Sequence, residues 1–313
     1  MRALLIVNPN ATSTTPRYRS MVARAIGSAI ELSVVSTNHR GHARQLAADS
    51  HNYDLVIGFG GDGTVNEVVN GLIDPETGRS RGPRLGVIPG GNVNVFARAA
   101  GISPDPTEAT EQLIESIASA RTRALNLGCL NWHENDKNQN RVFNFSAGIG
   151  LDATVIHEVD RLRRIGNPPS RSMYFVAAAK TILATSRSRN PKPLALVTGE
   201  RQRTDLAVAL VTTTDPWTYI KDRPIRPTPG ASFDGGIDMM AVTSGSAAAV
   251  FRAAQVLVSG KTPRGQTILH LHDQETIVLE SVEVLPLQAD GEAIGFAKRL
   301  QITSLPRALE IHY

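Results

Sequence analysis

The chain has 313 residues, of which 41% are hydrophobic and 20% charged, and this balance excludes an intrinsically disordered protein. Its net charge of +4 is too small to indicate a nucleic-acid-binding protein, although it suits contact with phosphates or with an anionic membrane surface. The single cysteine, Cys129, excludes an internal disulfide and a cysteine-based zinc site, so we expect a protein of the reducing cytoplasm.

Strand-like and helical segments alternate in the first part of the chain. Val65, Val68, Val69 and Leu72, for example, lie on one face of a helix that directly follows the apolar strand at 54–58. Such alternation predicts an α/β domain, a parallel sheet with helices on both faces. The expected strands are 3–7, 32–36, 54–58 and 84–88, and the expected helices are 16–30, 41–49, 65–72, 95–100 and 107–120.

From about residue 125 most strand-like segments follow one another without a helix between them. This order predicts a mainly antiparallel, sandwich-like β domain. We expect one domain at 1–124, completed by the last segment 305–313, and a second at 125–304; the Asn-rich stretch 131–140 is interpreted as a solvated hairpin loop. The expected strands are 125–130, 141–147, 193–198, 204–213, 237–243, 267–272, 276–279 and 283–288, and the longer helices are 172–186 and 246–258.

No segment reaches the roughly 18–20 consecutive apolar residues of a membrane-spanning helix. The most hydrophobic later stretch, 247–258, is interrupted by Arg252 and Gln255. We therefore expect a soluble protein, for which peripheral contact with the inner face of the membrane stays open. The basic residues around the helix expected at 172–186 are candidates for such contact, and a solvated charged face is the alternative. They are Arg161, Arg163, Arg164, Lys180, Arg187 and Arg189.

The stretch GFGGDGTVNEVVNGL at 58–72 matches the pattern G-x-G-x-x-G. A dinucleotide-binding fold is one interpretation, but here the motif follows the third strand and no acidic residue ends the next strand. A P-loop is excluded because no Gly-Lys-Ser/Thr follows. A purely structural turn is a further alternative, although four glycines are more than a turn requires.

The remaining interpretation is a phosphate-binding loop, and it must account for Asp62 at the tip of the loop. Glycines allow backbone N–H groups to approach phosphate oxygens, and the following helix adds the positive end of its dipole. A bare carboxylate would repel those oxygens unless a divalent cation bridges them. Mg²⁺ commonly binds through few carboxylates, several waters and substrate phosphates. Asp62 therefore indicates metal-assisted phosphoryl transfer.

The run from Gly60 to Thr64, with Asn66 and Glu67 after it, resembles the GGDGT signature of the diacylglycerol kinase catalytic-domain family. That family includes soluble bacterial lipid kinases, sphingosine kinases and ceramide kinases, and it is distantly similar to NAD kinases. Further segments resemble the family in the same order along almost the whole chain: 8–10, Thr37, 88–98, 143–153 and 290–292. The resemblance implies a nucleotide site formed by Asn8, Pro9, Asn10, Thr37, Gly60, Gly61, Asp62, Gly63, Thr64, Asn66, Glu67, Gly90, Asn92 and Asn94.

Three positions depart from the family pattern. Asn92 stands where the family usually has Thr, and Val95 stands where it usually has Asp, so a side-chain polar contact is lost at Val95. The segment 232–238 resembles a region that holds a structural Mg²⁺ in some bacterial members, but Gly235 replaces one of its acids. A metal ligand at Asp234 and an ordinary turn before a strand both stay open.

The resemblance implies a lipid kinase that uses ATP and Mg²⁺ and transfers the γ-phosphoryl group to the hydroxyl of a lipid alcohol such as diacylglycerol, with 125–304 as the lipid-substrate domain. It nominates Asp290 and Glu292, together with Asp62, as catalytic residues, and a hairpin turn is the alternative for Asp290-Gly291. An NAD kinase-like enzyme and a catalytically impaired lipid- or nucleotide-binding protein are the alternative functions. Whether the chain forms a homodimer stays open.

Overall fold

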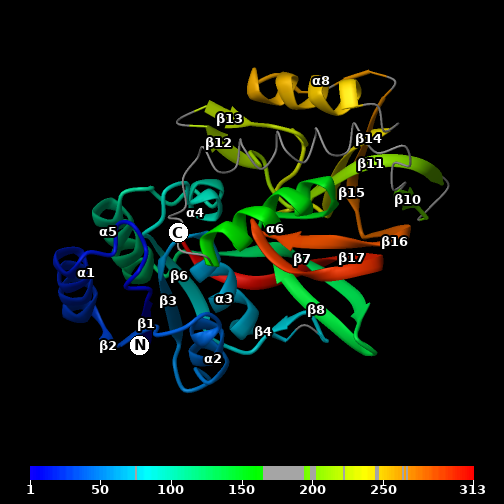
Figure 1. Cartoon of the computed structure of the whole chain (residues 1–313). Helices are drawn as coiled ribbons and strands as arrows, with labels where there is room; N and C mark the ends of the chain where they lie inside the picture. Colours follow the sequence, from blue (N-terminus) through cyan, green and yellow to red (C-terminus); the bar gives the residue numbers. More distant parts are fainter. Residues whose placement is uncertain are drawn as a thin grey trace. The chain divides into compact units, whose positions relative to one another are not determined.

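A computed structural model of the chain describes residues 1–74, 76–164, 194–197, 202–220, 223–243, 247–262, 264–265 and 267–313. The chain divides into two compact units (Figure 1). The first consists of Met1–Leu127 with Leu305–Tyr313, and the second of Gly128–Ser304. The helix expected at 172–186, with Lys180, lies outside the described residues, as do Arg187 and Arg189.

Five parallel strands form the sheet of the first unit. Their order is β17-β6-β3-β1-β2, where β17 contributes only its C-terminal end through the pair Ile311 and Leu85. The elements are β1 (Arg2–Val7), α1 (Pro16–Ala29), β2 (Glu31–Ser36), α2 (His42–Ala48), β3 (Leu55–Gly60), α3 (Asp62–Leu72), β4 (Ile73–Asp74), β5 (Arg79–Ser80), β6 (Arg84–Pro89), α4 (Val95–Ala99), α5 (Pro106–Ala118), the start of β7 (Thr122–Glu134) and the end of β17 (Glu292–His312).

Helices cover both faces of this sheet. Helix α1 packs against α5, and α2 packs against α3; Figure 1 shows the two pairs on opposite sides of the strands. Two of these helices, α1 and α5, begin at capping residues: Thr15 precedes Pro16, and Asp105 accepts hydrogen bonds from the backbone N–H groups of Thr107 and Glu108. The strands between them are almost entirely buried, which is why they read as continuous apolar runs in the sequence.

The described strands of the second unit pair in antiparallel fashion. One connected path runs β15-β14-β11-β10-β16-β17, and β9 pairs with both β11 and β16. The elements are the remainder of β7, β8 (Lys137–Phe143), β9 (Ser146–Gly150), α6 (Leu151–Arg164), β10 (Leu194–Leu196), β11 (Arg203–Thr212), β12 (Thr218–Ile220), β13 (Arg223–Ile225), β14 (Ile237–Thr243), α8 (Ala247–Val258), β15 (Ile268–Gln274), β16 (Thr276–Ala289) and β17 as far as Ser304.

The second unit differs in detail from the sequence-based expectations. Its principal strands are connected in one hydrogen-bonded path, and helix α6 was not expected. The Asn-rich stretch is a hairpin, as expected, but its arms are paired strands, and its turn residues Asn135 and Asp136 have positive φ, a conformation that Asn and Asp tolerate better than most residues. Segments 276–279 and 283–288 belong to a single strand, β16, with an irregular register between Glu280 and Leu285.

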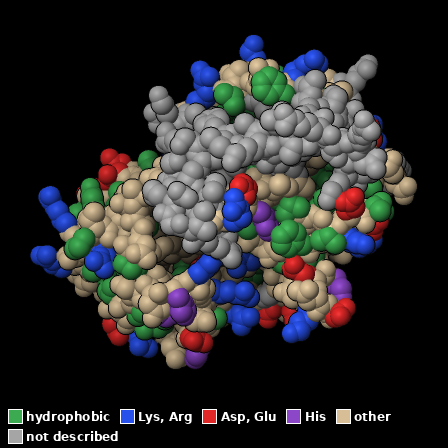
Figure 2. Space-filling model, in the orientation of Figure 1, with side chains coloured by type: hydrophobic (Ala, Val, Ile, Leu, Met, Phe, Trp, Pro, Cys, Tyr) green, Lys and Arg blue, Asp and Glu red, His purple; other side chains and the backbone are tan. Residues whose placement is uncertain are grey.

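Within the described residues, no helix combines the length and apolar character needed to cross a bilayer. Arg161, one of the basic residues considered for membrane contact, forms an ion pair with Glu158 one helical turn away. The Lys and Arg side chains visible in Figure 2 occur at several separate places among acidic side chains. The described surface therefore adds no support for a basic membrane patch at Arg161.

Candidate nucleotide and acceptor sites

Three loops of the first unit gather where parallel strands end. Asn8 follows β1, the loop at Gly61 follows β3, and the loop that starts at Gly90 follows β6. Neighbouring parallel strands place their carboxyl ends at the same edge of a sheet, which is where α/β proteins of this kind bind ligands. The structure thus brings together the segments 8–10, 60–64 and 90–94 that the sequence nominated for a nucleotide.

Hydrogen bonds join these loops to one another. The N–H of Gly90 donates to the carbonyl oxygen of Gly60 at 2.7 Å, and the N–H of Ser13 donates to the carbonyl oxygen of Gly90 at 2.8 Å. The Asn8 side-chain amide donates to the hydroxyl of Thr64 at 2.9 Å. Because each loop is held by its neighbour, their backbone positions are set before any ligand binds.

The glycines at this edge are required by close backbone approach. A Cβ atom on Gly91 would lie 2.7 Å from the Cα atom of Gly61, and one on Gly60 would lie 2.5 Å from the Thr64 hydroxyl oxygen. No side chain larger than hydrogen fits between the two loops without moving them. Gly61 is the N-cap residue of α3, and the first N–H groups of a helix suit phosphate oxygens.

The carboxylate of Asp62 caps a helix. It lies in the first turn of α3 and accepts hydrogen bonds at 3.1 Å from the backbone N–H groups of both Val95 and Phe96, at the start of α4. Helix α4 receives no capping hydrogen bond from the side chain of its own N-cap residue, Asn94. Burial raises the pKa of Asp62 above the ordinary Asp value, while the hydrogen bonds from Phe96 and Val95 limit that rise.

Other residues nominated for the nucleotide have hydrogen-bond partners within the first unit. Glu67 accepts hydrogen bonds from the N–H groups of Gly41, at 2.7 Å, and Ala43, at 3.2 Å, and so caps α2. The buried side chain of Asn94 bonds both backbone groups of Gly91, and Asn66 is also fully buried. Among the rest, Asn10 and Asn92 are exposed, while Pro9, Thr37 and Gly63 are partly exposed.

In the second unit, Asp290 is buried and its carboxylate is occupied by backbone groups. It accepts hydrogen bonds from the N–H groups of Asn144 at 2.7 Å, Phe145 at 2.9 Å and Ser146 at 3.0 Å. Asp290 itself has a positive φ of 49°. Glu292 is more accessible, with 23% of its side chain exposed, and its Oε2 atom lies 3.7 Å from the Arg141 guanidinium. The two nominated carboxylates therefore have different environments.

The expected metal ligand Asp234 is exposed, and the described residues contain no group of three His, Cys, Asp or Glu side chains that could hold a metal ion. The buried carboxylate in this segment is Asp238. It accepts hydrogen bonds from Nδ1 of His272 at 2.8 Å and from the N–H of Asp273 at 3.0 Å. A histidine and a backbone group thus satisfy the carboxylate nearest to the expected metal position.

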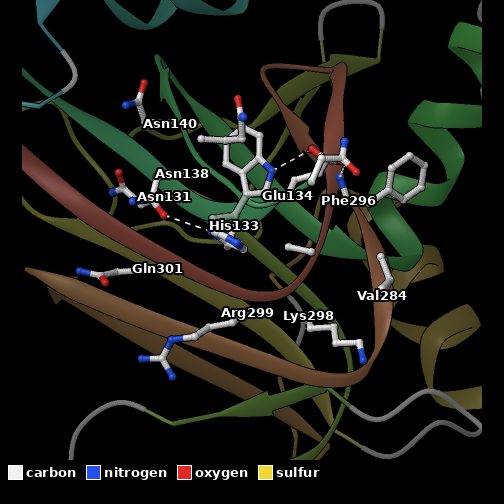
Figure 3. A pocket seen from close by; sticks show the side chains of 14 residues that line it. Asn131, His133, Glu134, Asn138, Asn140, Val284, Phe296, Lys298, Arg299 and Gln301 are labelled. Atoms are coloured by element: carbon white, nitrogen blue, oxygen red, sulfur yellow. Dashed lines mark hydrogen bonds between the residues drawn. The ribbon is translucent and has the colours of Figure 1, made fainter.

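A pocket of about 800 Å³ lies between the β7–β8 hairpin and the β16–β17 strands of the second unit (Figure 3). Glu134 organises one of its walls, because it accepts hydrogen bonds from the indole N–H of Trp132 and the backbone N–H of Phe296. None of the nominated site residues lines this pocket.

Sequence reasoning missed several groups at both sites. The backbone N–H of Val95 donates to Asp62, a contact that does not depend on the Val95 side chain. Thr14 is buried, its hydroxyl donates to the carbonyl oxygen of Asn8, and its methyl group contacts Gly90 closely. In the second unit, the Thr213 hydroxyl donates to the carbonyl oxygen of Asn144. Only the run of threonines at 212–214 offered a sequence signal for the last contact.

The segment that contains the first of these sites is similar to known proteins. Residues 2–127 match the family model described as the diacylglycerol kinase catalytic domain. This segment belongs to that family. A diacylglycerol kinase of Bacillus subtilis (strain 168) is 37% identical over 136 residues, which are 42% of this chain and 42% of that protein. One of Staphylococcus aureus (strain bovine RF122 / ET3-1) is 34% identical over 174 residues, 53% of this chain and 50% of that protein.

These alignments cover about half the length of the curated relatives, whereas similarity of fold extends over the whole chain. The structure of a diacylglycerol kinase from Bacillus anthracis str. Sterne matches with a TM-score of 0.69 at 20% identity, covering 100% of this chain and 96% of that one. An NAD kinase from Archaeoglobus fulgidus in complex with ATP matches with a TM-score of 0.54 at 12% identity, covering 100% and 94%. Both likenesses concern the fold alone.

Proposed function

We propose that the protein is a lipid kinase that uses ATP and Mg²⁺ and phosphorylates the hydroxyl of a lipid alcohol, most readily diacylglycerol. One observation carries this proposal: the diacylglycerol kinase domain match coincides with three interlocked loops at the carboxyl edge of the parallel sheet, where Gly61 and Gly91 leave no room for a side chain. The N–H groups at the start of a helix such as α3 suit the phosphates of a nucleotide.

The residues present suit magnesium that arrives with the nucleotide better than a resident metal ion. Each oxygen of the Asp62 carboxylate accepts one N–H, so lone pairs remain for a water of a hydrated cation. Mg²⁺ bound with the nucleotide would neutralise charge on the transferring group. Asp62 would hold its hydration shell and at the same time fix α4, and with it the loop at 90–94.

We assign the base to Glu292 and a positioning role to Asp290. As the lipid hydroxyl oxygen bonds to the γ-phosphorus, the bond from that phosphorus to the β,γ-bridging oxygen breaks and ADP leaves. The hydroxyl proton passes to the Glu292 carboxylate. Asp290 cannot serve as easily, because three backbone N–H groups already stabilise its negative charge.

Incubation of the purified chain with γ-labelled Mg-ATP and a panel of lipid alcohols tests the proposal, with NAD as a separate arm. Label in phosphatidic acid is the expected result. Label in the nucleotide fraction with NAD alone would support the NAD kinase alternative. Binding of ATP without transfer to any acceptor would support a protein that has lost catalysis.

A further inference from the structure

Strands β9, β11, β14 and β16 of the second unit begin or end at the same level, and this row of strand termini is called the edge below. In β11 and β9, Thr212 lies opposite Ser146; in β16 and β9, Ala289 lies opposite Ala147. Strand β14 starts at the same level, because Thr212 also lies opposite Asp238. The polar segments that flank these strand ends, around residues 144, 213–215 and 290–292, are therefore neighbours along this edge.

The backbone of Asn144 is fixed from two sides at this edge. Its N–H donates to Asp290 at 2.7 Å, and its carbonyl oxygen accepts the Thr213 hydroxyl at 2.6 Å. The residue is fully buried. Yet neither the nitrogen nor the oxygen of its side-chain amide has a hydrogen-bond partner among the described residues. Both of these hydrogen bonds between Asn144 and other described residues are thus made by its backbone.

An amide buried in this way is costly. A polar group removed from water without a partner destabilises the folded state, and an apolar side chain of similar size would avoid that cost. A second group in the flanking segments is in the same state: Oδ1 of Asp215 is buried without a hydrogen-bond partner among the described residues, although Oδ2 is bound by Arg226 at 2.6 Å. Unsatisfied polar groups that persist in a fold often belong to a binding site.

We propose that Asn144 is a positioning residue for the acceptor, and that with Asp215 it hydrogen-bonds the polar end of the lipid alcohol. The inference rests on the proposed function and deepens it. The Asn144 amide can donate to an ester carbonyl oxygen and accept from a hydroxyl, and the free Asp215 oxygen can only accept. The pair fits an acceptor that carries a second polar group beside its hydroxyl, such as a diacylglycerol, better than a plain fatty alcohol.

The buried position also suits the chemistry. Glu292, the proposed base, lies two residues after Asp290, and Asp290 holds the backbone of Asn144. A hydroxyl that enters the protein to reach the Asn144 amide is shielded from bulk water, which would otherwise compete for the phosphoryl group.

The test uses Asn144→Leu in the full-length chain, with dioctanoylglycerol and dodecanol as acceptors in mixed micelles. We expect the KM for dioctanoylglycerol to rise about tenfold, as for one lost hydrogen bond. The KM values for dodecanol and ATP should change less than twofold. The thermal midpoint should stay level or rise, since a costly amide has been removed. Asn70→Leu provides the contrast, because the Asn70 amide is buried and partnered, and its loss should lower the midpoint.

A second readout separates this inference from the kinase assignment. Dioctanoylglycerol should raise the thermal midpoint of the wild-type chain without ATP, and this rise should shrink in Asn144→Leu and in Asp215→Asn. If the wild type transfers no phosphoryl group yet shows this difference, only the proposed function fails. An unchanged acceptor KM and an unchanged lipid-induced shift in Asn144→Leu would overturn the inference. A lowered thermal midpoint with a normal acceptor KM and a normal lipid-induced shift would also overturn the inference. It would indicate that an ordered water is the partner of the Asn144 amide.

Discussion

The carboxylate of Asp62 accepts the backbone N–H of Phe96 at 3.1 Å, and this bond joins the glycine loop after β3 to the first turn of α4. The residue at the centre of the GGDGT signature is therefore also part of the framework. One side chain fixes two loops that would face the same nucleotide. Its replacement should affect stability as well as turnover.

We predict that Asp62→Ala lowers the free energy of unfolding by about 1–2 kcal/mol, the usual cost of losing a helix cap. Asp62→Asn should cost less, because the amide keeps one oxygen to accept an N–H. Both variants should lose phosphoryl transfer, since neither carries the charge. Urea denaturation of the three proteins provides the measurement. Equal stability of Asp62→Ala and the wild type would show that the cap contributes nothing.

Asp290 and Glu292 form a matched pair for isosteric substitution. Asp290→Asn should lower the free energy of unfolding by about 2–3 kcal/mol, because an amide nitrogen would face buried N–H groups that the carboxylate now accepts. Glu292→Gln breaks the partly exposed ion pair with Arg141 and should cost less than about 1 kcal/mol.

The two substitutions should also differ in their effect on turnover. Glu292→Gln should reduce kcat at least 100-fold, the lower range for a general base, at an unchanged thermal midpoint. A normal kcat for Glu292→Gln would show that another residue is the general base, and Asp290 would then be the first alternative. The thermal midpoints and the initial rates of both variants, measured on the same preparations, decide which of the two residues is the base.

Glu67 should behave as a structural residue despite its place in the family signature. Helix α2 has a glycine at its N-cap, and the Glu67 carboxylate supplies the missing acceptor for Gly41 and Ala43. Glu67→Ala should therefore cost about 1 kcal/mol of stability and leave the KM for ATP within twofold of normal. Glu111→Ala, at an exposed position on α5, is the control and should change neither value. A large rise in the KM for ATP would contradict this prediction and would indicate that Glu67 contributes to nucleotide binding.

The pair formed by His272 and Asp238 should make stability depend on pH. The hydrogen bond and the charge of Asp238 raise the pKa of His272 above its ordinary value of 6.5. A raised pKa means that the folded state holds the proton more tightly, so the contribution is fully present below pH 6.5 and is lost as the pH rises through the higher folded value. Because His272 is exposed, the effect should stay below about 1 kcal/mol.

Comparison of the wild type with His272→Gln between pH 5.5 and pH 8.5 isolates this contribution. The stability difference between the two proteins should be largest at the acidic end and vanish at the alkaline end. The buried His312, whose pKa is lowered by desolvation, is present in both proteins and cancels. A difference that grows with pH would contradict the assigned sign.

The central parallel strands of the first unit could be predicted because they are largely buried and read as apolar runs, as in Leu55–Gly60, whereas β2 at the edge of the sheet is partly exposed. The three loops could be nominated because glycine and Asn-Pro turns follow those runs directly. The partners of their side chains could not be predicted. Asp62 and Glu67 cap helices 33 and 24 residues away in the chain, and no local pattern signals such a contact.

The second unit was less predictable for a related reason. Its strands pair over long sequence separations, as Leu210 does with Gly148 and Met240, so local alternation identifies strands without showing their order. Asn144 had no sequence signal beyond its neighbours, because an unsatisfied amide becomes evident only when every surrounding group has been placed. Helix α6 was missed because only the more apolar helical stretches were identified there.

The most direct test of the account compares γ-phosphoryl transfer to dioctanoylglycerol by the wild-type chain and by Gly91→Ala. A Cβ atom at this position would force the Gly90 and Gly61 loops apart without altering any proposed catalytic side chain. We predict that the wild type forms labelled phosphatidic acid and that Gly91→Ala loses most of this transfer while remaining folded. Absence of labelled lipid with the wild type, or equal rates for the two proteins, would contradict a lipid kinase that works through these loops.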